Sequence, residues 1–388
     1  MVKRITSQDR ISQPHDSVKI DRLRARGYNQ TAESVREARK LKKSQEFELR
    51  KVVGDLNTLC GIASFTFNDG PARGVKAYRA KNGQGLTVTV AADRGLDIPY
   101  ASFKGVPVGF TSVTGMRSPA LYQEDGAPGF LKQFYGGLLT TCGITYSGAA
   151  CEDEGQKLGL HGPFSNTPAE GVCAEAFYDG DEKKLRFAGS VRESRVFGAN
   201  MLLKREMVVE TERSVIHITD VVENQGVAEQ PVMMVYHINF GYPLLDDGAL
   251  VYANSKTVTP RDDIAAANFE KYNLMEAPGI GRPEECFFHT QPDGEAFAML
   301  YNTKMGMAAI VRYDAEALPL LCEWKCMHAG DYALGLEPTA AGVMGRAAAR
   351  KAGELPMLAP GESRAFKLSI EMTDDPALIE AFKAKAVK

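Results

Sequence analysis

Two side chains that could form an acid–base pair stand a hundred residues apart in this chain, at His237 and Glu337. His237 follows an apolar run at residues 231–235, and Glu337 follows Leu-Gly-Leu at residues 334–336. Each pattern predicts a buried strand with the titratable group at its end. Histidine changes charge near neutral pH and a carboxylate accepts protons, so the two groups could exchange protons with a bound molecule. The pair predicts a proton-transfer enzyme.

A third titratable group, His161, lies in the loop sequence Leu158-Gly-Leu-His-Gly-Pro-Phe-Ser-Asn. The glycines of this loop allow the backbone to approach a ligand closely. A single loop histidine is more often structural or solvated than catalytic. Both interpretations therefore stay open for His161 when it is taken alone.

Several further residues could contact a ligand. Arg94 follows the strand expected over residues 86–91 and offers a planar fork of N–H donors, although a salt bridge with a neighbouring aspartate is the alternative. Asn239 and Tyr242 belong to the same segment as His237, and Tyr242 offers an aromatic surface. Trp324, the single tryptophan, is a second aromatic candidate, with a core position as its alternative.

Three basic residues, Arg117, Lys132 and Arg282, could recognise a phosphate or a carboxylate on a ligand. Their sequence surroundings show no supporting pattern. A surface role is therefore the default expectation for each of them.

From about residue 50 onward the sequence is typical of β structure. Asn-Gly and Asp-Gly pairs recur, and they supply the positive φ that tight hairpins require. Between such turns lie apolar or alternating segments of strand length, at residues 86–91, 185–191, 207–210, 215–222, 296–301, 307–313 and 366–372. The pattern predicts an all-β fold, built as a large antiparallel β-sandwich.

Helical periodicity is clear only at residues 31–44, with a weaker pattern at residues 375–382. The first of these carries a thin apolar stripe from Ala32 to Leu41 on a highly charged helix. We therefore expect a basic, partly helical extension over residues 1–50 and a β-sandwich domain over residues 51–388. The extension could be solvated, could cover the main domain, or could form a homodimer contact.

Charge and hydropathy exclude several classes of protein. Residues 1–50 hold 13 Lys/Arg against 7 Asp/Glu, but the formal net charge of the whole chain is -3, so we expect neither nucleic acid nor an anionic membrane as a partner. No segment approaches the ~18–20 apolar residues of a membrane span. The basic start is not followed by an apolar segment, so no secretory signal is expected.

Cysteine usage points to a reducing compartment. The seven cysteines show no framework spacing, which favours free thiols and a cytoplasmic location. Cys322 and Cys326, with His328 nearby, would need a fourth ligand and a second motif to resemble a structural zinc site. Core or strand-facing thiols are the favoured interpretation, and no metal is expected.

Three motifs together resemble the aldose 1-epimerases, or galactose mutarotases. Leu160-His161-Gly162 is similar to the Leu-His-Gly loop of that family, the segment from Tyr236 to Phe240 is similar to its histidine-bearing strand, and Leu336-Glu337-Pro338 is similar to its Leu-Glu-Pro. The motifs occur in the family's order, and the resemblance covers about residues 50–375. Tyr236 replaces the usual asparagine and Gly-Pro-Phe replaces a Gly-Gly pair, so the chain resembles a divergent branch.

The resemblance implies a sugar-binding isomerase that opens the ring of an aldose and closes it as the other anomer. Glu337 would be the base at the anomeric hydroxyl and His237 the acid at the ring oxygen, on opposite sides of the sugar, with His161 beside the ring oxygen. Arg94 would match a sugar-binding arginine, and Asp263, or its neighbour Asp262, a hydroxyl-binding aspartate. A monosaccharide is then the expected partner, and the reaction requires no cofactor.

Two alternatives to this activity stay open. One is an epimerase or isomerase of a phosphorylated or acidic sugar. The other is a carbohydrate-binding or sensor protein without turnover, because a fold does not determine a function. Retention of an acid and a base favours an enzyme, since a protein that only binds sugars needs neither.

Overall fold

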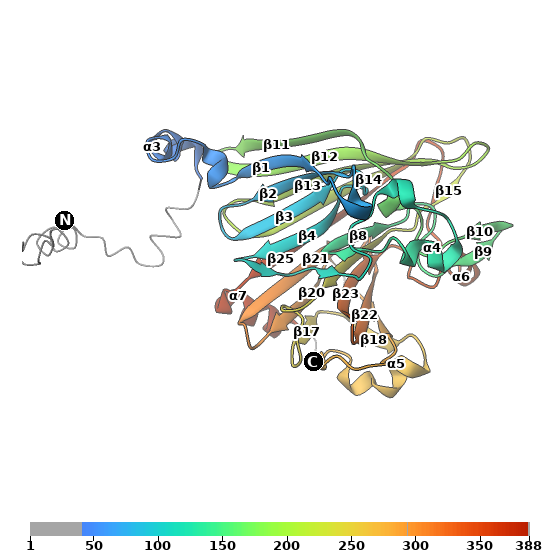
Figure 1. Cartoon of the computed structure of the whole chain (residues 1–388). Helices are drawn as coiled ribbons and strands as arrows, with labels where there is room; N and C mark the ends of the chain where they lie inside the picture. Colours follow the sequence, from blue (N-terminus) through green and yellow to red (C-terminus); the bar gives the residue numbers. More distant parts are fainter. Residues whose placement is uncertain (1–40, 293, 387–388) are drawn as a thin grey trace, which may run out of the picture. The chain divides into compact units, whose positions relative to one another are not determined.

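Two large antiparallel sheets dominate the computed structural model, which describes residues 41–292 and 294–386 (Figure 1). Within these residues the larger sheet has eleven strands. In spatial order they are β1 (Gly61–Thr66), β2 (Lys76–Lys81), β3 (Leu86–Ala91), β4 (Asp97–Phe103), β8 (Leu139–Cys142), β16 (Val235–Phe240), β23 (Asp331–Thr339), β22 (Leu320–His328), β19 (Glu285–Thr290) and β18 (Thr257–Pro260), with β5 (Val106–Pro107) paired to β4.

The second large sheet has eight strands in the described part of the chain. Their spatial order is β11 (Glu170–Asp179), β12 (Glu182–Ser194), β13 (Asn200–Glu210), β14 (Val215–Asn224), β25 (Ser363–Thr373), β21 (Met307–Asp314), β20 (Glu295–Asn302) and β17 (Leu250–Ala253). Three short ribbons accompany the two sheets: β6 (Phe110–Thr111) with β7 (Gly136–Gly137), β9 (Cys151–Asp153) with β10 (Gln156–Leu158), and β15 (Gln230–Pro231) with β24 (Met357–Leu358).

The helices of the described residues are short and lie in the connections or near the chain ends. The α-helices are α3 (Glu46–Arg50), α4 (Gly126–Leu131), α5 (Asp263–Ala267), α6 (Arg346–Ala352) and α7 (Pro376–Lys385). The 3-10 helices are η1 (Lys43–Gln45), η2 (Leu56–Thr58), η3 (Gly70–Ala72), η4 (Pro119–Leu121), η5 (Phe164–Asn166) and η6 (Phe269–Lys271).

The main hydrophobic core lies between the two sheets. Val88 and Ile98 of the eleven-stranded sheet belong to the same buried cluster as Phe187 and Ile218 of the eight-stranded sheet. Burial of a side chain of this size contributes roughly 1.5–3 kcal/mol, so the facing apolar sides stabilise the packing of the two sheets. The prediction of an all-β antiparallel sandwich is confirmed.

The expected strands are confirmed as well. The alternation at residues 366–372 places four apolar side chains in the core from β25, namely Phe366, Leu368, Ile370 and Met372. The turn between β11 and β12 uses the Asp179-Gly180 pair, with Gly180 at φ 62°. This left-handed conformation is costly for residues with a Cβ, which is why the turn needs glycine.

The C-terminal helix expected at residues 375–382 is confirmed as α7. Asp375 caps it by accepting a hydrogen bond from the Ala377 N–H, and Ile379 and Phe382 pack on the outer face of the eight-stranded sheet. The helix expected at residues 31–44 lies largely outside the described residues. Of its apolar stripe the structure describes Leu41, which is buried in the main core. The domain boundary after residue 50 stays a prediction.

The strand expected at residues 231–235 is wrong in position. The strand that carries His237 is β16, which begins at Val235 and runs to Phe240, so the histidine lies inside the strand instead of at its end. The backbone N–H groups of Val232 and Met233 donate to Pro356 and Ile144 in connecting segments, and this pairing prevents the strand from starting earlier. Glu337 likewise lies within β23.

None of the helices in the described residues is long and apolar enough to cross a membrane.

Candidate active site

His237 and Glu337 lie next to each other on neighbouring strands. The register pairs Ile238 of β16 with Leu336 of β23, and this antiparallel pairing brings the adjacent His237 and Glu337 together. Nδ1 of His237 lies 3.3 Å from Oε1 of Glu337, and both side chains are buried. Neither atom makes a hydrogen bond to the described residues. The two groups predicted to act as acid and base therefore meet at one site.

His161 reaches the same site from the loop before η5. Its φ of 61° is in the left-handed region, and its backbone is held between Gly148 and Gly143 by hydrogen bonds of 2.9 and 3.1 Å. A Cβ at Gly162 would lie 2.6 Å from two carbonyl oxygens, so only glycine fits behind the histidine. The imidazole of His161 lies 5.5 Å from that of His237, measured between ring centroids. A strained conformation of this kind is typical of functional positions.

These three residues line a cleft of about 680 Å³ on the outer face of the eleven-stranded sheet. Aromatic side chains surround the imidazole of His237, with the rings of Phe134 and Trp324 at 5.1 and 5.4 Å. The Trp324 N–H donates to Oε2 of Glu284 at 2.8 Å. Trp324, for which a core position was the alternative, thus lies in the cleft.

Burial controls the protonation of the three titratable groups. It raises the pKa of Glu337 well above its usual range, and the neighbouring Cys286 and Glu284 add to this shift. It lowers the pKa of His237 well below its usual range, helped by His161 and partly offset by Asn239. It also lowers the pKa of His161 to about 4. Burial therefore favours the neutral form of all three side chains, which leaves a proton on the carboxyl of Glu337.

Arg94 does not line this cleft. Its guanidinium is fully buried over the ring of Tyr135 and donates to the backbone carbonyls of Ser165, Arg117 and Gln133. These bonds tie the β3–β4 connection, which carries Arg94, to the segments that contain Arg117, Gln133 and Ser165. The arginine predicted to bind sugar is placed as a structural clamp.

The other predicted ligand-binding residues also lie outside the cleft lining. Asp263 is exposed in the first turn of α5, where its neighbour Asp262 caps the helix. Tyr242 is 70% exposed beyond the end of β16. Asn239 is buried two residues after His237 and donates to the His237 carbonyl at 2.9 Å, so it supports the histidine from beside it.

The cleft contains residues that the sequence did not single out. Arg261 donates to Oε1 of Glu284 and to Sγ of Cys286, both at 2.9 Å, and all three line the cleft. Phe130 and Phe134 enter the cleft from α4 and the residues after it. Arg261 directly precedes Asp262 and Asp263, the two aspartates predicted as candidates. Nothing in the sequence indicates that the arginine reaches the site and that the aspartates do not.

Alternate residues of β22, including both of its cysteines, face the cleft. Cys322 and Cys326 line it on either side of Trp324, as strand-facing thiols should. Across residues 41–292 and 294–386, no group of three or more His, Cys, Asp or Glu side chains is arranged to hold a metal ion.

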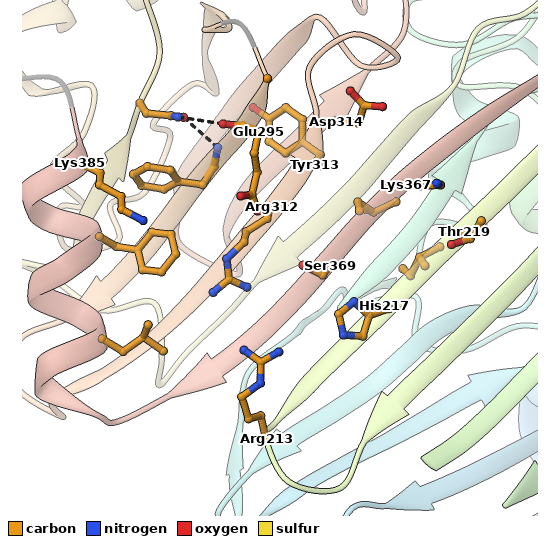
Figure 2. A pocket seen from close by; sticks show the side chains of 17 residues that line it. Arg213, His217, Thr219, Glu295, Arg312, Tyr313, Asp314, Lys367, Ser369 and Lys385 are labelled. Carbon is orange, nitrogen blue, oxygen red and sulfur yellow. Dashed lines mark hydrogen bonds between the residues drawn. The ribbon is translucent and has the colours of Figure 1, made fainter. Parts of the chain in front are cut away.

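A second hollow, of about 810 Å³, lies on the outer face of the eight-stranded sheet beside α7 (Figure 2). His217, Ser369 and Arg312 stand on neighbouring strands of its floor. Two of its titratable side chains are paired: Arg312 with Glu371, and His217 with Glu210. None of the predicted site residues lines this hollow.

The comparisons with known proteins agree with this fold. A protein from Klebsiella pneumoniae, provisionally assigned as an aldose 1-epimerase, superposes with a TM-score of 0.77 at 24% identity, covering 89% of this chain and 94% of that one. A galactose mutarotase-like protein from Clostridium acetobutylicum gives 0.59 at 14% identity, covering 82% and 99%. Galactose 1-epimerase from Lactobacillus acidophilus gives 0.54 at 13% identity, covering 80% and 98%.

At these identities the likeness establishes the galactose mutarotase-like fold and leaves the activity of this chain open. No curated protein sequence matches the chain. One family model does match, over residues 72–372, and it is described as a domain of unknown function, DUF4432. Because this match spans well over half of the 388 residues, the chain belongs to the DUF4432 family.

Proposed function

We propose that this protein is an aldose 1-epimerase that interconverts the anomers of a monosaccharide by acid–base ring opening. The observation that carries the proposal is the contact of 3.3 Å between His237 and Glu337 in a buried, aromatic-lined cleft. A protein that only binds sugars needs no acid–base pair, and two adjacent titratable groups with unpaired atoms cost stability when they are buried.

Ring opening needs one proton removed and one proton supplied. The anomeric hydroxyl O1 loses a proton to a base while the ring oxygen O5 gains one from an acid, and the C1–O5 bond breaks to leave an open aldehyde. Rotation about C1–C2 presents the other face of the carbonyl, and closure reverses both transfers. Each positioned proton transfer contributes typically 10²–10⁴ in rate.

The side-by-side arrangement differs from the expectation that acid and base flank the sugar. Because O1 and O5 are both bonded to C1, an adjacent acid and base can serve them from one side. Glu337 would face O1 and His237 would face O5, with His161 beyond O5. The aromatic rings of Phe134 and Trp324 would exclude water from the reacting atoms.

The short distance between His237 and Glu337 suits this chemistry. The neutral pair and the ion pair contain the same number of protons, and a transfer across the 3.3 Å contact interconverts them. In the ion pair Glu337 is the base and His237 the acid, as the motif resemblance implies. The reverse reaction requires the opposite assignment, which the neutral pair provides.

The proposal is tested by adding the protein to freshly dissolved single anomers and following their equilibration by polarimetry or by NMR saturation exchange. We expect at least one aldose of a panel to equilibrate faster than in buffer. Glu337→Gln and His237→Asn should each abolish most of the acceleration, because each removes one proton-transfer group while keeping the side chain's approximate size.

Two outcomes would contradict the proposal. If no aldose equilibrates faster although NMR titration detects sugar binding in the cleft, the protein is a carbohydrate-binding protein without turnover. If Glu337→Gln retains full activity, the reaction takes place elsewhere in the molecule.

A further inference from the structure

The candidate cleft has an apolar end and a polar end, with the acid–base pair between them. A series of contacts runs across it: Phe130 to His161 at 4.9 Å, His161 to His237 at 5.5 Å, and His237 to Trp324 at 5.4 Å. From Trp324 it continues through a hydrogen bond of 2.8 Å to Glu284, which is bonded to Arg261. The series runs from Phe130 at one end of the cleft to Glu284 and Arg261 at the other.

The apolar end lies on the side of His161. Phe130 packs there in one cluster with Leu160 and Val343, and all three line the cleft. They come from α4, from the loop that carries His161, and from the loop between β23 and α6. Phe134 belongs to the same cluster but also packs against Trp324, with ring centroids 6.4 Å apart, so it lies between the two ends. The described residues of this cluster offer a ligand no charged side chain.

The charges of the cleft are concentrated away from that end and are mostly negative. Besides the neutral Glu337, its described lining residues include two acids, Glu284 and Asp331, against one guanidinium, that of Arg261. Arg261 is itself paired with Asp262 at 2.8 Å and with Glu284 at 2.9 Å. The cleft therefore opposes a phosphate or carboxylate on the ligand, because a second anion would meet uncompensated negative charge.

The basic residues that could have recognised such an anion lie elsewhere. Arg117, Lys132 and Arg282 do not line the cleft. Lys132 pairs with Asp125 at 3.5 Å and Arg282 with Glu276 at 2.7 Å, while the backbone of Arg117 receives a bond from Arg94. This placement removes the argument for a phosphorylated or acidic sugar.

The direction of the cleft, together with the proposed roles of Glu337 and His237, orients a pyranose in it. With O5 facing His237 and His161, the next ring atom, C5, and its substituent C6 point toward Phe130, Leu160 and Val343. The hydroxyls on C2 to C4 then lie toward Trp324, Glu284 and Arg261, which can accept and donate hydrogen bonds. The C6 substituent thus meets apolar surface.

We infer that the preferred substrate is a neutral sugar with an apolar group at C5, that is, a 6-deoxyhexose with a methyl group at this position. The inference rests on the proposed function and narrows it. The side chains of Phe130, Leu160 and Val343 offer no hydrogen-bond partner to the hydroxyl of a hydroxymethyl group, whereas a methyl group buries surface against them. The imidazole of His161, whose Nδ1 is unpaired, serves O5 in the proposed orientation.

The test compares sugars that differ only at C6. Equilibration rates are measured for 6-deoxygalactose against galactose and for 6-deoxyglucose against glucose, with glucose 6-phosphate and glucuronate as anionic probes. We expect kcat/KM to favour each 6-deoxy sugar by about 10- to 100-fold, the range in which an apolar pocket discriminates against an added hydroxyl. The anionic sugars should be slower than glucose.

A pair of matched variants locates the effect. Val343→Thr keeps the side-chain shape and adds a hydroxyl at the apolar end, so it should reduce the 6-deoxy preference several-fold. Val113→Thr makes the same change at a cleft residue that is 86% exposed, and it should leave the preference unchanged.

The outcomes separate this inference from the proposed function. Equal or higher kcat/KM for galactose and glucose, or faster reaction of an anionic sugar, overturns the 6-deoxy preference while the epimerase activity stands. No acceleration of any sugar overturns the epimerase activity itself. A preference that Val113→Thr reduces as strongly as Val343→Thr does would remove the apolar end as its cause.

Discussion

Tyr236 and His237 are neighbours on β16, and their side chains project to opposite faces of the strand. Tyr236 faces the interior of the sandwich, where its hydroxyl donates to Asp220 at 2.8 Å. His237 faces the cleft, where its Nδ1 approaches Glu337 without a hydrogen bond. Tyr236 therefore belongs to a buried cluster of ionisable side chains inside the sandwich, the interior group, and His237 belongs to a second cluster in the cleft, the cleft group.

The interior group is fully paired. Arg205 of β13 makes five hydrogen bonds, to Asp220, Asp97, Thr141 and the Gly95 carbonyl, which accounts for all five N–H donors of a guanidinium. Burial by itself would lower the pKa of Arg205, but the carboxylates more than offset this and raise it. Because Arg205 and Asp220 belong to one sheet and Asp97 and Thr141 to the other, the group fixes the sheets relative to each other.

The cleft group is left incomplete. Nδ1 of His161, Nδ1 of His237 and Oε1 of Glu337 make no hydrogen bond to the described residues. The interior group has all its guanidinium hydrogen bonds, whereas the cleft group on the other face of β16 has unpaired atoms. We therefore expect the interior group to stabilise the fold and the cleft group to contact a ligand. The following predictions test that separation.

The largest expected effect is on activity, through Glu337→Gln. We expect a loss of about 10²- to 10⁴-fold in kcat, equivalent to about 2.7–5.5 kcal/mol, because one proton-transfer group is removed. Stability should change by less than about 1 kcal/mol, since glutamine, like the neutral carboxyl of Glu337, buries no charge. Urea unfolding beside the kinetics measures both quantities. A loss of several kcal/mol of stability would mean that the cleft pair is structural.

Arg205→Met should have the opposite profile. Removing the guanidinium leaves Asp97 and Asp220 buried without a cation, which costs about 3–5 kcal/mol of unfolding free energy. The triple variant Arg205→Met, Asp97→Asn, Asp220→Asn should recover much of this loss, because no uncompensated charge remains. Chemical denaturation of the wild type and both variants makes the comparison. A single variant as stable as the wild type would contradict the stabilising role.

Asp97 should make stability depend on pH. Burial raises the pKa of Asp97 to about 6 although Arg205 and Thr141 act against this shift, whereas an exposed aspartate titrates near 3.8. Between these values the folded protein binds a proton more tightly than the unfolded chain, so this contribution to stability is present at low pH and is lost as pH rises from about 4 to about 6. Its size is on the order of 3 kcal/mol.

The measurement is the difference in unfolding free energy between the wild type and Asp97→Asn at several pH values from 4 to 7. The variant keeps the side-chain shape but cannot titrate, so the other groups cancel in the difference. We expect the advantage of the wild type to decline across this window and then level off. A difference that is constant with pH would show that Asp97 stays ionised throughout.

Tyr236→Phe gives the smallest effect and the sharpest comparison with its neighbour. It removes one hydrogen bond to a charged group, which costs about 1.5–3 kcal/mol of stability. The ring stays in the core and Asp220 keeps its bonds to Arg205, so kcat should change by less than about 3-fold, against the large loss expected for His237→Asn. Similar losses of activity in the two variants would mean that the two faces of β16 are not independent.

Much of the fold could be predicted from local patterns. The strands at residues 86–91 and 366–372, the Asp179-Gly180 turn and the C-terminal helix all follow from alternation, turn chemistry and capping within a few residues. The catalytic candidates could be named for a similar reason, since His161, His237 and Glu337 each lie in a recognisable short motif. The start of β16 could not be predicted, because it depends on bonds from residues 232–233 to connecting segments.

Ligand contacts were harder to predict than catalytic candidates. Arg94 and Arg261 look alike in sequence, each beside an aspartate after an expected or observed strand. The structure buries Arg94 among backbone carbonyls and brings Arg261 to the cleft. The difference arises from which loops pack against each guanidinium, and the neighbouring residues in the sequence do not predict this packing.

The sequence by itself determined the class of fold and the residue types available for proton transfer, because alternation, turns and motifs act over a few residues. Only the tertiary structure decided that His237 and Glu337 are in contact, that Trp324 lies in the cleft and not in the core, and that one end of the cleft is apolar. These facts depend on strand register and on loops more than a hundred residues apart, which are set by the packing of the whole sandwich.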